Sequence, residues 1–388
     1  GVNVVDLGLS TTPTVEVAVP ALHADGGIIL TASHNPANWN ALKLLNSKGE
    51  FINAEEGGRL LDFAKSGDFT FPEVEATGWY RKDEGWIEKH VEMILTHPLV
   101  NLEAIKTANF KVAVDPVNST GGLAIPILLK ELGVTNVEMI NGDVSGNFAH
   151  NPEPLREHLV ETSQLVTQKA CDLGIVVDPD VDRLAMISEN GEMFGEEYTL
   201  VAIADYYMGN QAGPTVSNLS SSRALRSVTE HAGQSYFASA VGEVNVVTKM
   251  KEVGAVIGGE GNGGIIVPDF HYGRDALIGI ALFLSHLAES GKKMSELRSG
   301  YPHFEMAKNK VQLKPGMNPD ELISQMILKY SNEETSTIDG LKIDFSEGWV
   351  HLRKSNTEPI IRIYTESSSK EDALALAERF EKELLSLI

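Results

Sequence analysis

The chain has 388 residues, which is too long for one ordinary hydrophobic core and indicates three or four domains. A net charge of −22 argues against nucleic acids and anionic membranes as partners. The apolar stretch 276–284 is far shorter than a membrane span, and no signal peptide is expected from the opening residues. Cys171 is the single cysteine, which excludes an internal disulfide and indicates a reducing, cytoplasmic location.

The first half of the chain alternates expected strands and helices. Up to the boundary that we place in the Pro-, Gly- and charge-rich stretch 66–78, we expect strands at 2–6, 27–30 and 39–45 and helices at 15–22 and 54–65. Beyond it we expect helices at 86–95, 123–132 and 157–169 and strands at 110–115, 137–140 and 174–177. This βαβ alternation predicts a mostly parallel sheet.

The second half begins with a hairpin-like stretch at 185–192 and then repeats the alternation. Helices are expected at 198–208, 223–230, 244–253 and 276–288, with strands at 215–218 and 254–257 and with Asp275 as a helix N-cap. From about residue 301 the pattern changes to strands at 305–310, 341–345, 349–353 and 360–365, with helices at 319–330 and 370–388.

These patterns predict an α/β fold with three related mixed α/β sheet domains and a C-terminal α+β domain. The expected domains are residues 1–77, 78–189, 190–301 and 302–388. A repeated sequence pattern suggests the three related units. In each copy a glycine and three apolar residues, typical of a fully buried strand, are followed by a loop with chemically functional side chains. The three loops carry Ser33, the triplet Asp178, Asp180 and Asp182, and Glu260. Because ligands bind at the carboxyl ends of strands in open α/β sheets, we expect these loops to form one site.

The three alternating aspartates predict a Mg²⁺ site, because Mg²⁺ favours a few carboxylates together with a phosphate oxygen. The spacing is similar to the start of a calcium EF-hand loop, but the glycine and distal glutamate of that loop are missing. The remaining alternative is a solvated turn.

Ser33 alone is weak as a signal, because serines after strands are mostly turn or N-cap residues. His34 beside it raises the alternative of a serine hydrolase, although adjacent side chains rarely point the same way. A serine that faces a metal loop favours a phosphoseryl group instead, with one of its oxygens available to Mg²⁺.

Two further loops are candidates for ligand binding. Residues 259–264, Gly-Glu-Gly-Asn-Gly-Gly, place Glu260 and Asn262 in a backbone that can approach sugar hydroxyls closely; a flexible turn is the alternative. The donor-rich loop after the strand at 349–353 suits a phosphate monoester, with edge-strand charges and a turn as the alternative. Its candidate donors are Arg353, Ser355, Asn356, Thr357 and Arg362.

Together, the loops at 31–36, 178–183, 259–264 and 353–359 resemble the α-D-phosphohexomutase superfamily of phosphoglucomutases, phosphomannomutases and phosphoglucosamine mutases. All four signature loops stand in the family's order across essentially the whole chain. The resemblance implies a heart-shaped, four-domain enzyme with a central cleft, which moves a phosphoryl group between the 1- and 6-positions of a hexose phosphate. It also implies a bisphosphorylated sugar intermediate and a catalytic hexose 1,6-bisphosphate as activator.

Carried over residue by residue, the resemblance implies that Ser33 is the phosphoserine and that Asp178, Asp180 and Asp182 hold Mg²⁺ against its phosphate. The resemblance also implies that Lys43 and Arg183 are basic groups near the transferred phosphoryl group. It implies that Glu260 and Asn262, with Arg274, bind the sugar hydroxyls, and that the loop 353–357, with Arg362, binds the distal phosphate. Lys43 is our first choice as general acid/base, with His271 or Arg274 as helpers.

Relative to the family, the chain begins inside the first domain, and a loop with a Ser/Arg pair near the phosphoserine is absent from the sequence. Full activity is therefore not expected of this chain alone, and two other functions stay open: a Mg²⁺-dependent phosphatase and a non-catalytic sugar-phosphate-binding fragment. The stretches 241–246 and 261–264 resemble phosphoglucosamine mutases of the archaeal type. We expect a small sugar phosphate as ligand, and a monomer or homodimer.

Overall fold

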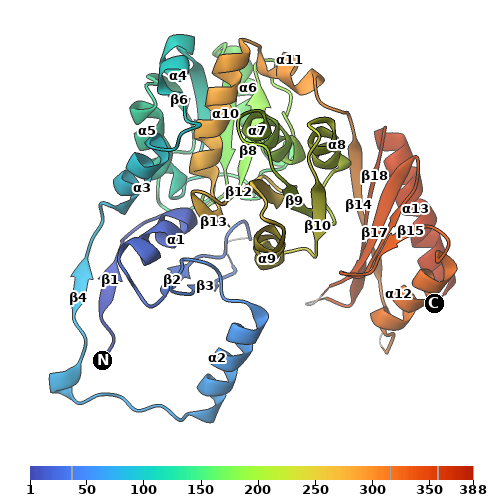
Figure 1. Cartoon of the computed structure of the whole chain (residues 1–388), viewed down its shortest axis with the longest axis horizontal. Helices are drawn as coiled ribbons and strands as arrows, with labels where there is room; N and C mark the ends of the chain where they lie inside the picture. Colours follow the sequence, from blue (N-terminus) through green and yellow to red (C-terminus); the bar gives the residue numbers. More distant parts are fainter. Residues whose placement is uncertain (36–37, 315, 356–357, 388) are drawn as a thin grey trace.

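The computed structural model describes residues 1–35, 38–314, 316–355 and 358–387. Two predicted phosphate-binding residues, Asn356 and Thr357, lie outside this part of the chain. The described strands form five sheets, which follow one another from the blue N-terminal part to the red C-terminal part (Figure 1). No helix in the described residues combines the length and the apolar character that crossing a membrane requires.

The N-terminal part contains two small sheets, and its elements are β1 (Val4–Asp6), α1 (Thr12–Ala21), β2 (Gly27–Leu30), β3 (Leu42–Leu45), α2 (Ala54–Ser66), the 3₁₀-helix η1 (Val74–Ala76) and β4 (Tyr80–Lys82). β2 pairs with β3 in antiparallel fashion, whereas β1 pairs in parallel with β4, which lies beyond residue 77. The extended segment between α2 and β4 runs along the lower edge of the molecule (Figure 1).

The prediction that β2 is a fully buried strand is wrong. Ile29 is 8% exposed, but Ile28 is 66% and Leu30 is 78% exposed. Among the described strands β2 pairs only with β3, and α1 packs on this small sheet. Because successive side chains of a strand point to opposite faces, only Ile29 reaches the apolar cluster with Val19 of α1.

The second part has a four-stranded sheet, and its elements are α3 (Trp86–Leu95), α4 (Leu102–Ala108), β5 (Lys111–Asp115), α5 (Gly121–Glu131), β6 (Asn136–Met139), the 3₁₀-helix η2 (Arg156–His158), α6 (Val160–Gln168), β7 (Leu173–Val177) and β8 (Leu184–Ser188). The strand order is β6-β5-β7-β8, and only β8 runs antiparallel to its neighbour. All five residues of β7 are buried, as predicted for the strand before the aspartates.

The third part has a five-stranded sheet, and its elements are α7 (Glu196–Asn210), β9 (Thr215–Asn218), α8 (Arg223–His231), β10 (Tyr236–Ser239), α9 (Glu243–Val253), β11 (Ile257–Glu260), β12 (Gly264–Val267), β13 (His271–Arg274), α10 (Ala276–Ser290) and α11 (Met294–Ser299). The strand order is β10-β9-β11-β12-β13. Asp275 caps α10, as predicted, because its Oδ1 accepts the N–H of Leu277 at 2.7 Å.

The strand expected at 254–257 begins three residues later. Gly254 takes a left-handed conformation, with φ of 63°, and ends α9 there. The glycine-rich stretch 259–264 is consequently part of a tight β11–β12 hairpin, in which Glu260 pairs with Gly264. The stretch thus contains a turn, as its alternative interpretation expected, at residues 261–263 between the two strands.

The C-terminal part is an antiparallel sheet covered by helices, and its elements are β14 (Glu305–Gln312), α12 (Pro319–Lys329), β15 (Glu334–Ser336), β16 (Leu341–Asp344), β17 (Gly348–Lys354), β18 (Ile360–Ser367) and α13 (Lys370–Ser386). The strand order is β14-β18-β17-β16-β15. α12 and α13 pack on this sheet, which stands to one side of the molecule (Figure 1).

The hydrophobic cores divide the molecule differently from the sheets. One large core runs from Ile87 of α3 to Tyr301 and so joins the second and third parts. The C-terminal part has a core of its own, centred on buried side chains such as Phe380.

Polar contacts connect the C-terminal part to the third part. The backbone N–H of Arg223 donates to Glu366 at 3.0 Å, and its Nη2 donates to Asp344 at 2.9 Å. His351 Nδ1 lies 2.9 Å from Ser220 Oγ, and its Nε2 lies 2.6 Å from the carbonyl of Asp339.

Candidate functional site

The three aspartates form a buried group after β7. Asp178, Asp180 and Asp182 are 0%, 3% and 0% exposed, so the solvated-turn alternative is wrong. One ligand atom from each residue lies within 4.8 Å of the others, which is a group able to hold a metal ion. Oδ1 of Asp180 and Oδ1 of Asp182 are buried without a hydrogen-bond partner among the described residues.

The loop around the aspartates is rigidly held and strained. Val181 has φ of 64°, an unusual conformation for a β-branched residue. The hydroxyls of Ser119 and Thr120 donate to the carbonyl of Pro179 at 2.7 and 2.8 Å. Burial and then the repulsion from the other two aspartates raise the pKa of Asp178. A cation would relieve this repulsion and pair the orphaned oxygens, so the donor set fits a divalent metal.

Lys43 of β3 reaches the same group. Its Nζ lies 2.6 Å from Asp180 Oδ2 and 2.8 Å from Asp182 Oδ2. Burial opposes the ammonium, but the attraction of the two aspartates outweighs it and raises the pKa of Lys43. A charged lysine at this point is suited to stabilise negative charge, and the role of Lys43 as general acid/base stays a prediction.

Thr12 is a site residue that the sequence reasoning missed. At the start of α1, its hydroxyl donates to Asp180 Oδ2 at 2.6 Å, and its N–H donates to the Asp180 carbonyl at 2.9 Å. The available signal is the stretch Leu-Ser-Thr-Thr-Pro at 9–13, which places hydroxyl side chains directly before the expected helix.

Ser33 lies against the aspartate loop, as predicted. Its Oγ donates to Asp178 Oδ2 at 3.1 Å, and its N–H donates to Thr31 Oγ1 at 2.9 Å. Its φ of 52° is rare for a residue other than glycine and is typical of strained functional positions.

His34 lies beside Ser33, with its Nδ1 3.3 Å from Ser33 Oγ. Burial, followed by the charge of Arg183, lowers the pKa of His34 to about 4. So weak a base is poorly suited to take a proton from a serine, which argues against the serine-hydrolase alternative.

Arg183 follows the aspartates directly and is 8% exposed. Its Nε lies 4.0 Å from Asp178 Oδ2 and 4.0 Å from Asp182 Oδ1. This N–H is buried and has no hydrogen-bond partner in the described part of the chain. It is therefore available to an anionic ligand.

Arg274 joins the metal loop to the glycine-rich loop. It donates to Asp182 at 2.7 Å, to Glu260 at 2.9 Å and to Glu243 at 3.0 Å. Three carboxylates therefore engage the guanidinium for which we predict a contact with the sugar. The pairing with Glu243 was not predicted, because the two residues lie 31 positions apart and share no local pattern.

Glu260 and Asn262 both contact neighbouring backbone or side chains. Glu260 is 5% exposed, and its Oε1 accepts Asn218 Nδ2 at 2.8 Å and the N–H of Gly242 at 3.1 Å. Asn262 Oδ1 accepts the N–H of Gly264 at 3.2 Å and is half-buried in the hairpin turn. The structure thus places Glu260 as a bridge between β9, the start of α9 and Arg274.

Arg353 and Arg362 face each other directly across β17 and β18. Both strands have neighbours on either side, so the edge-strand alternative is wrong. Arg353 Nε lies 2.8 Å from Asp339 Oδ2, which also accepts the N–H of Val241 at 2.9 Å. Ser355 Oγ accepts the N–H of Glu358 at 3.2 Å.

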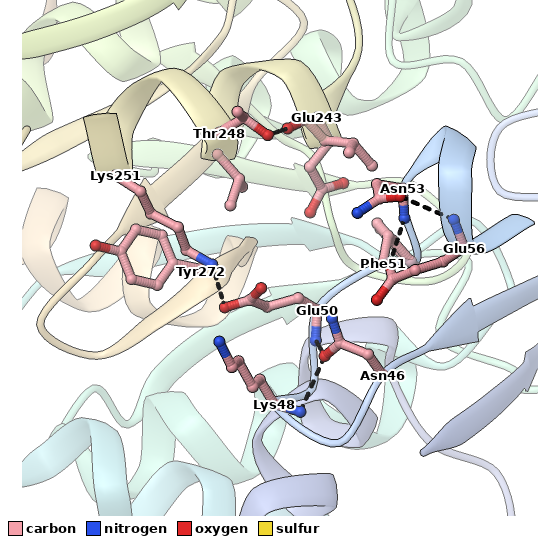
Figure 2. A pocket seen from close by; sticks show the side chains of 12 residues that line it. Asn46, Lys48, Glu50, Phe51, Asn53, Glu56, Glu243, Thr248, Lys251 and Tyr272 are labelled. Carbon is pink, nitrogen blue, oxygen red and sulfur yellow. Dashed lines mark hydrogen bonds and ion pairs between the residues drawn. The ribbon is translucent and has the colours of Figure 1, made fainter. Parts of the chain in front are cut away.

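A polar cavity of about 220 Å³ lies between the segment 46–56 and α9 (Figure 2). Lys251 and Glu50 pair across it, and Tyr272 and Lys48 line it (Figure 2). Glu243 belongs to its wall and links the cavity to Arg274.

Four family models match the chain one after another, and each describes a domain of phosphoglucomutase/phosphomannomutase. The alpha/beta/alpha domains I, II and III match residues 1–70, 88–191 and 195–304, and the C-terminal domain matches residues 306–383.

Similar proteins carry related names. The phosphoglucomutase/phosphomannomutase of Thermococcus kodakarensis is 35% identical over 96% of this chain and 81% of its own length. The phosphoglucosamine/phosphogalactosamine mutase of Sulfurisphaera tokodaii is 33% identical over 98% of this chain and 85% of its own length. A solved phosphoglucomutase/phosphomannomutase family protein from Burkholderia thailandensis has a TM-score of 0.84 at 25% identity, over 100% of this chain and 83% of that one.

Proposed function

The chain belongs to the phosphoglucomutase/phosphomannomutase family of α-D-phosphohexomutases, which are isomerases, and from this premise we propose how its own residues carry the reaction. Ser33 carries a phosphoryl group and gives it to a hydroxyl of a hexose phosphate. The observation that carries this proposal is the 3.1 Å hydrogen bond from Ser33 Oγ to Asp178 within a buried aspartate triad.

Asp178, Asp180 and Asp182 would hold Mg²⁺, because buried carboxylate oxygens are the ligands that this ion prefers, and Oδ1 of Asp180 and Oδ1 of Asp182 have no hydrogen-bond partner among the described residues. When bound, Mg²⁺ neutralises charge on the phosphoryl oxygens during transfer. Zinc-type nitrogen or sulfur ligands are missing from this group, which consists of three carboxylates.

The residues around the triad supply the remaining stabilisation of negative charge. Phosphoryl transfer spreads charge over the equatorial oxygens, so catalysis rests on positioned cations. Lys43 brings an ammonium beside Asp180 and Asp182, and Arg183 brings an Nε–H that has no hydrogen-bond partner among the described residues. In the first transfer the bond from Ser33 Oγ to phosphorus breaks and a sugar oxygen forms the new bond. In the second, the other phosphoryl group of the bisphosphate returns to Ser33.

The phosphate that is not transferred binds between Arg353 and Arg362. Arg353, which also contacts Asp339, stands directly opposite Arg362, and two guanidinium groups in this arrangement suit a phosphate dianion. Ser355 supplies a neighbouring hydroxyl, and Asn356 and Thr357 complete the loop in this proposal.

We assign recognition of the sugar to Glu260, Asn262 and Arg274. For the substrate we lean towards glucosamine phosphate, because several similar proteins are named phosphoglucosamine mutases. A glucose or mannose phosphate is the second candidate, since one similar protein is named phosphoglucomutase/phosphomannomutase. We propose a cytoplasmic monomer or homodimer that is activated by a hexose 1,6-bisphosphate.

The test incubates the full chain with Mg²⁺, a catalytic bisphosphate and, separately, glucosamine 6-phosphate, glucose 1-phosphate and mannose 1-phosphate. Formation of the positional isomer, followed by ³¹P NMR, supports the mutase. Release of free phosphate alone supports the phosphatase, and absence of both products supports a binding fragment. Intact mass that shows no added phosphoryl group after bisphosphate treatment contradicts the role of Ser33.

A further inference from the structure

A second cluster of metal-ligating side chains lies outside the aspartate triad. His90 of α3, His271 of β13 and Asp275 before α10 bring ligand atoms within 4.8 Å of one another. His90 Nε2 lies 2.9 Å, and His271 Nε2 lies 3.2 Å, from the same oxygen, Asp275 Oδ2. His90 and Asp275 are both 0% exposed, and the side chain of His271 is 12% exposed.

The second nitrogen of each imidazole also has a polar neighbour. His90 Nδ1 lies 2.9 Å from Thr14 Oγ1, and His271 Nδ1 lies 3.5 Å from Glu16 Oε2. Thr14 and Glu16 both come from α1. In protein metal sites, a ligating histidine usually donates its other N–H to a carboxylate or another oxygen, which fixes the tautomer.

Glu16 is an independent sign that a positive charge is missing here. It is 2% exposed, and both of its carboxylate oxygens are buried without a hydrogen-bond partner among the described residues. His271 Nδ1, which faces it, is also buried and unpartnered. An unsatisfied buried carboxylate is costly, because its charge has lost its contact with water without gaining a partner.

The positions of the imidazole N–H hydrogens differ between the cluster without a cation and the cluster with one. Without a cation, and with Glu16 ionised and both imidazoles neutral, the two Nε2–H groups donate to Asp275, so both Nδ1 atoms are acceptors and His271 Nδ1 faces the Glu16 carboxylate, acceptor against acceptor. With a cation between the two Nε2 lone pairs and Asp275 Oδ2, both Nδ1 atoms carry hydrogens. His271 can then donate to Glu16, and His90 can donate to Thr14, which pairs His271 Nδ1 and one of the two unpartnered Glu16 oxygens.

We propose that His90, His271 and Asp275 bind a zinc ion, and that Glu16 and Thr14 orient the two imidazoles. Two nitrogens and one carboxylate oxygen, with water as the fourth ligand, form a set that Zn²⁺ accepts. Bonds of about 2.0–2.1 Å in a tetrahedron separate ligand atoms by about 3.3 Å, so the observed 2.9 and 3.2 Å need only small shifts. The charge of the ion balances the carboxylates of Glu16 and Asp275.

The ion would tie together three segments that are distant in sequence. α1 packs against α3 and against β13, and the cluster lies where these elements meet. The same α1 begins with Thr12, which binds the aspartate loop, and Asp275 follows Arg274, which binds Asp182. The site is therefore a structural cross-link, and imidazole ligands distinguish it from the all-carboxylate magnesium group.

The experiment strips the full-length protein with EDTA and then titrates it with zinc in a large excess of Mg²⁺. We expect about one equivalent of zinc to be retained, as measured by plasma mass spectrometry, and a higher thermal midpoint with zinc than without it. Co²⁺ in place of zinc should give the intense visible absorption of a tetrahedral site. Mutase activity is not a readout, so the result is independent of the function proposed above.

Variants locate the ion. His90→Gln should abolish stoichiometric retention, and Glu16→Gln should weaken zinc binding by about 10–100-fold. His303→Gln is the matched control, because His303 is an exposed histidine beside Glu305 and should have no effect. Asp178→Asn should likewise retain zinc, since it alters only the magnesium group.

Two results would overturn the proposal. One is wild-type protein that retains no zinc under these conditions. The other is equal retention by wild type and by a His90→Gln variant whose circular dichroism shows it to be folded. If that variant does not fold, X-ray absorption of the zinc-loaded wild type decides, because a shell without imidazole nitrogens contradicts the assignment.

Discussion

β2 and β7 each deliver a reacting loop to the same point, but the protein supports them differently. β7 lies inside a four-stranded sheet with every residue buried, whereas β2 has one neighbouring strand and exposes Ile28 and Leu30. The aspartates are accordingly fixed, and Ser33 is held by a few polar contacts. In the mechanism proposed above, a phosphoserine at Ser33 serves two positions of a turning substrate, and a buried aspartate loop that faces a lightly held serine loop suits this division of roles.

The largest expected effect is a loss of mutase activity with little change in thermal stability. Ser33→Ala should lower mutase activity by roughly four orders of magnitude or more, because the covalent carrier is removed. The thermal midpoint should change by little, since Ser33 contributes few contacts to folding. Coupled isomerisation assays and a thermal melt measure the two effects, with Ser346→Ala as a surface serine control. A large loss of stability together with activity would mean that the serine loop is structural.

A stability series tests the burial contrast directly. Ile175→Ala in β7 should cost about 3–5 kcal/mol of the free energy of unfolding, because Ile175 is 1% exposed in the large core. Ile29→Ala in β2 should cost about 2–3 kcal/mol, and Ile28→Ala less than about 0.5 kcal/mol. Urea denaturation measures all three. Equal losses at Ile28 and Ile29 would show that another surface covers the outer face of β2.

The polar attachment of the C-terminal part should respond to pH. Burial lowers the pKa of His351 to about 4, so folding favours its neutral form. Its stabilising contribution is complete above the ordinary pKa of about 6.5 and is lost as the pH falls from there towards 4. Unfolding free energy should therefore drop by about 2 kcal/mol between pH 7.5 and pH 5 on account of this residue.

The control for this prediction is His351→Gln, compared with His303→Gln at the exposed histidine. Urea denaturation at both pH values should show a smaller pH dependence in His351→Gln than in wild type, and an unchanged one in His303→Gln. The same pH dependence of the free energy of unfolding in wild type and both variants would contradict the prediction.

The smallest expected effect concerns the contact between the N-terminal helix and the metal loop. Thr12→Val removes the hydroxyl that donates to Asp180 and should weaken Mg²⁺ binding by about tenfold, because hydrogen bonds to ligating carboxylates orient them. Thr12→Ser keeps the hydroxyl and should bind like wild type. Isothermal titration of Mg²⁺ compares the two, and equal weakening would assign the effect to packing at this position.

The sequence predicted most of the regular structure, because strands and helices such as β7 and α10 carry strong local patterns. It missed short elements, among them α4, β10 and β15, whose patterns extend over too few residues. It predicted that β2 is a strand but not that its sheet is small. The number of neighbouring strands depends on distant segments and leaves no mark on a four-residue pattern.

The candidate site was likewise predicted only in part from the sequence. Ser33, Lys43 and the three aspartates were found from loop chemistry and family resemblance, and the structure brings them together. Thr12, Glu243 and His90 were missed as site residues, because each acts through a partner far away in the chain. The carboxylates that occupy Arg274 could not be predicted either, since no spacing in the sequence reports a three-way ion pair.

The separation of the hydrophobic cores has a calorimetric consequence. The largest apolar core joins residues between Ile87 and Tyr301, and the C-terminal sheet has its own core, joined to the rest by Arg223, His351 and their partners. The chain should then melt as at least two cooperative blocks, with the smaller one able to come apart while the metal loop stays folded. A ligand phosphate held by the smaller block and a sugar held by the larger one would merge these two endotherms into one.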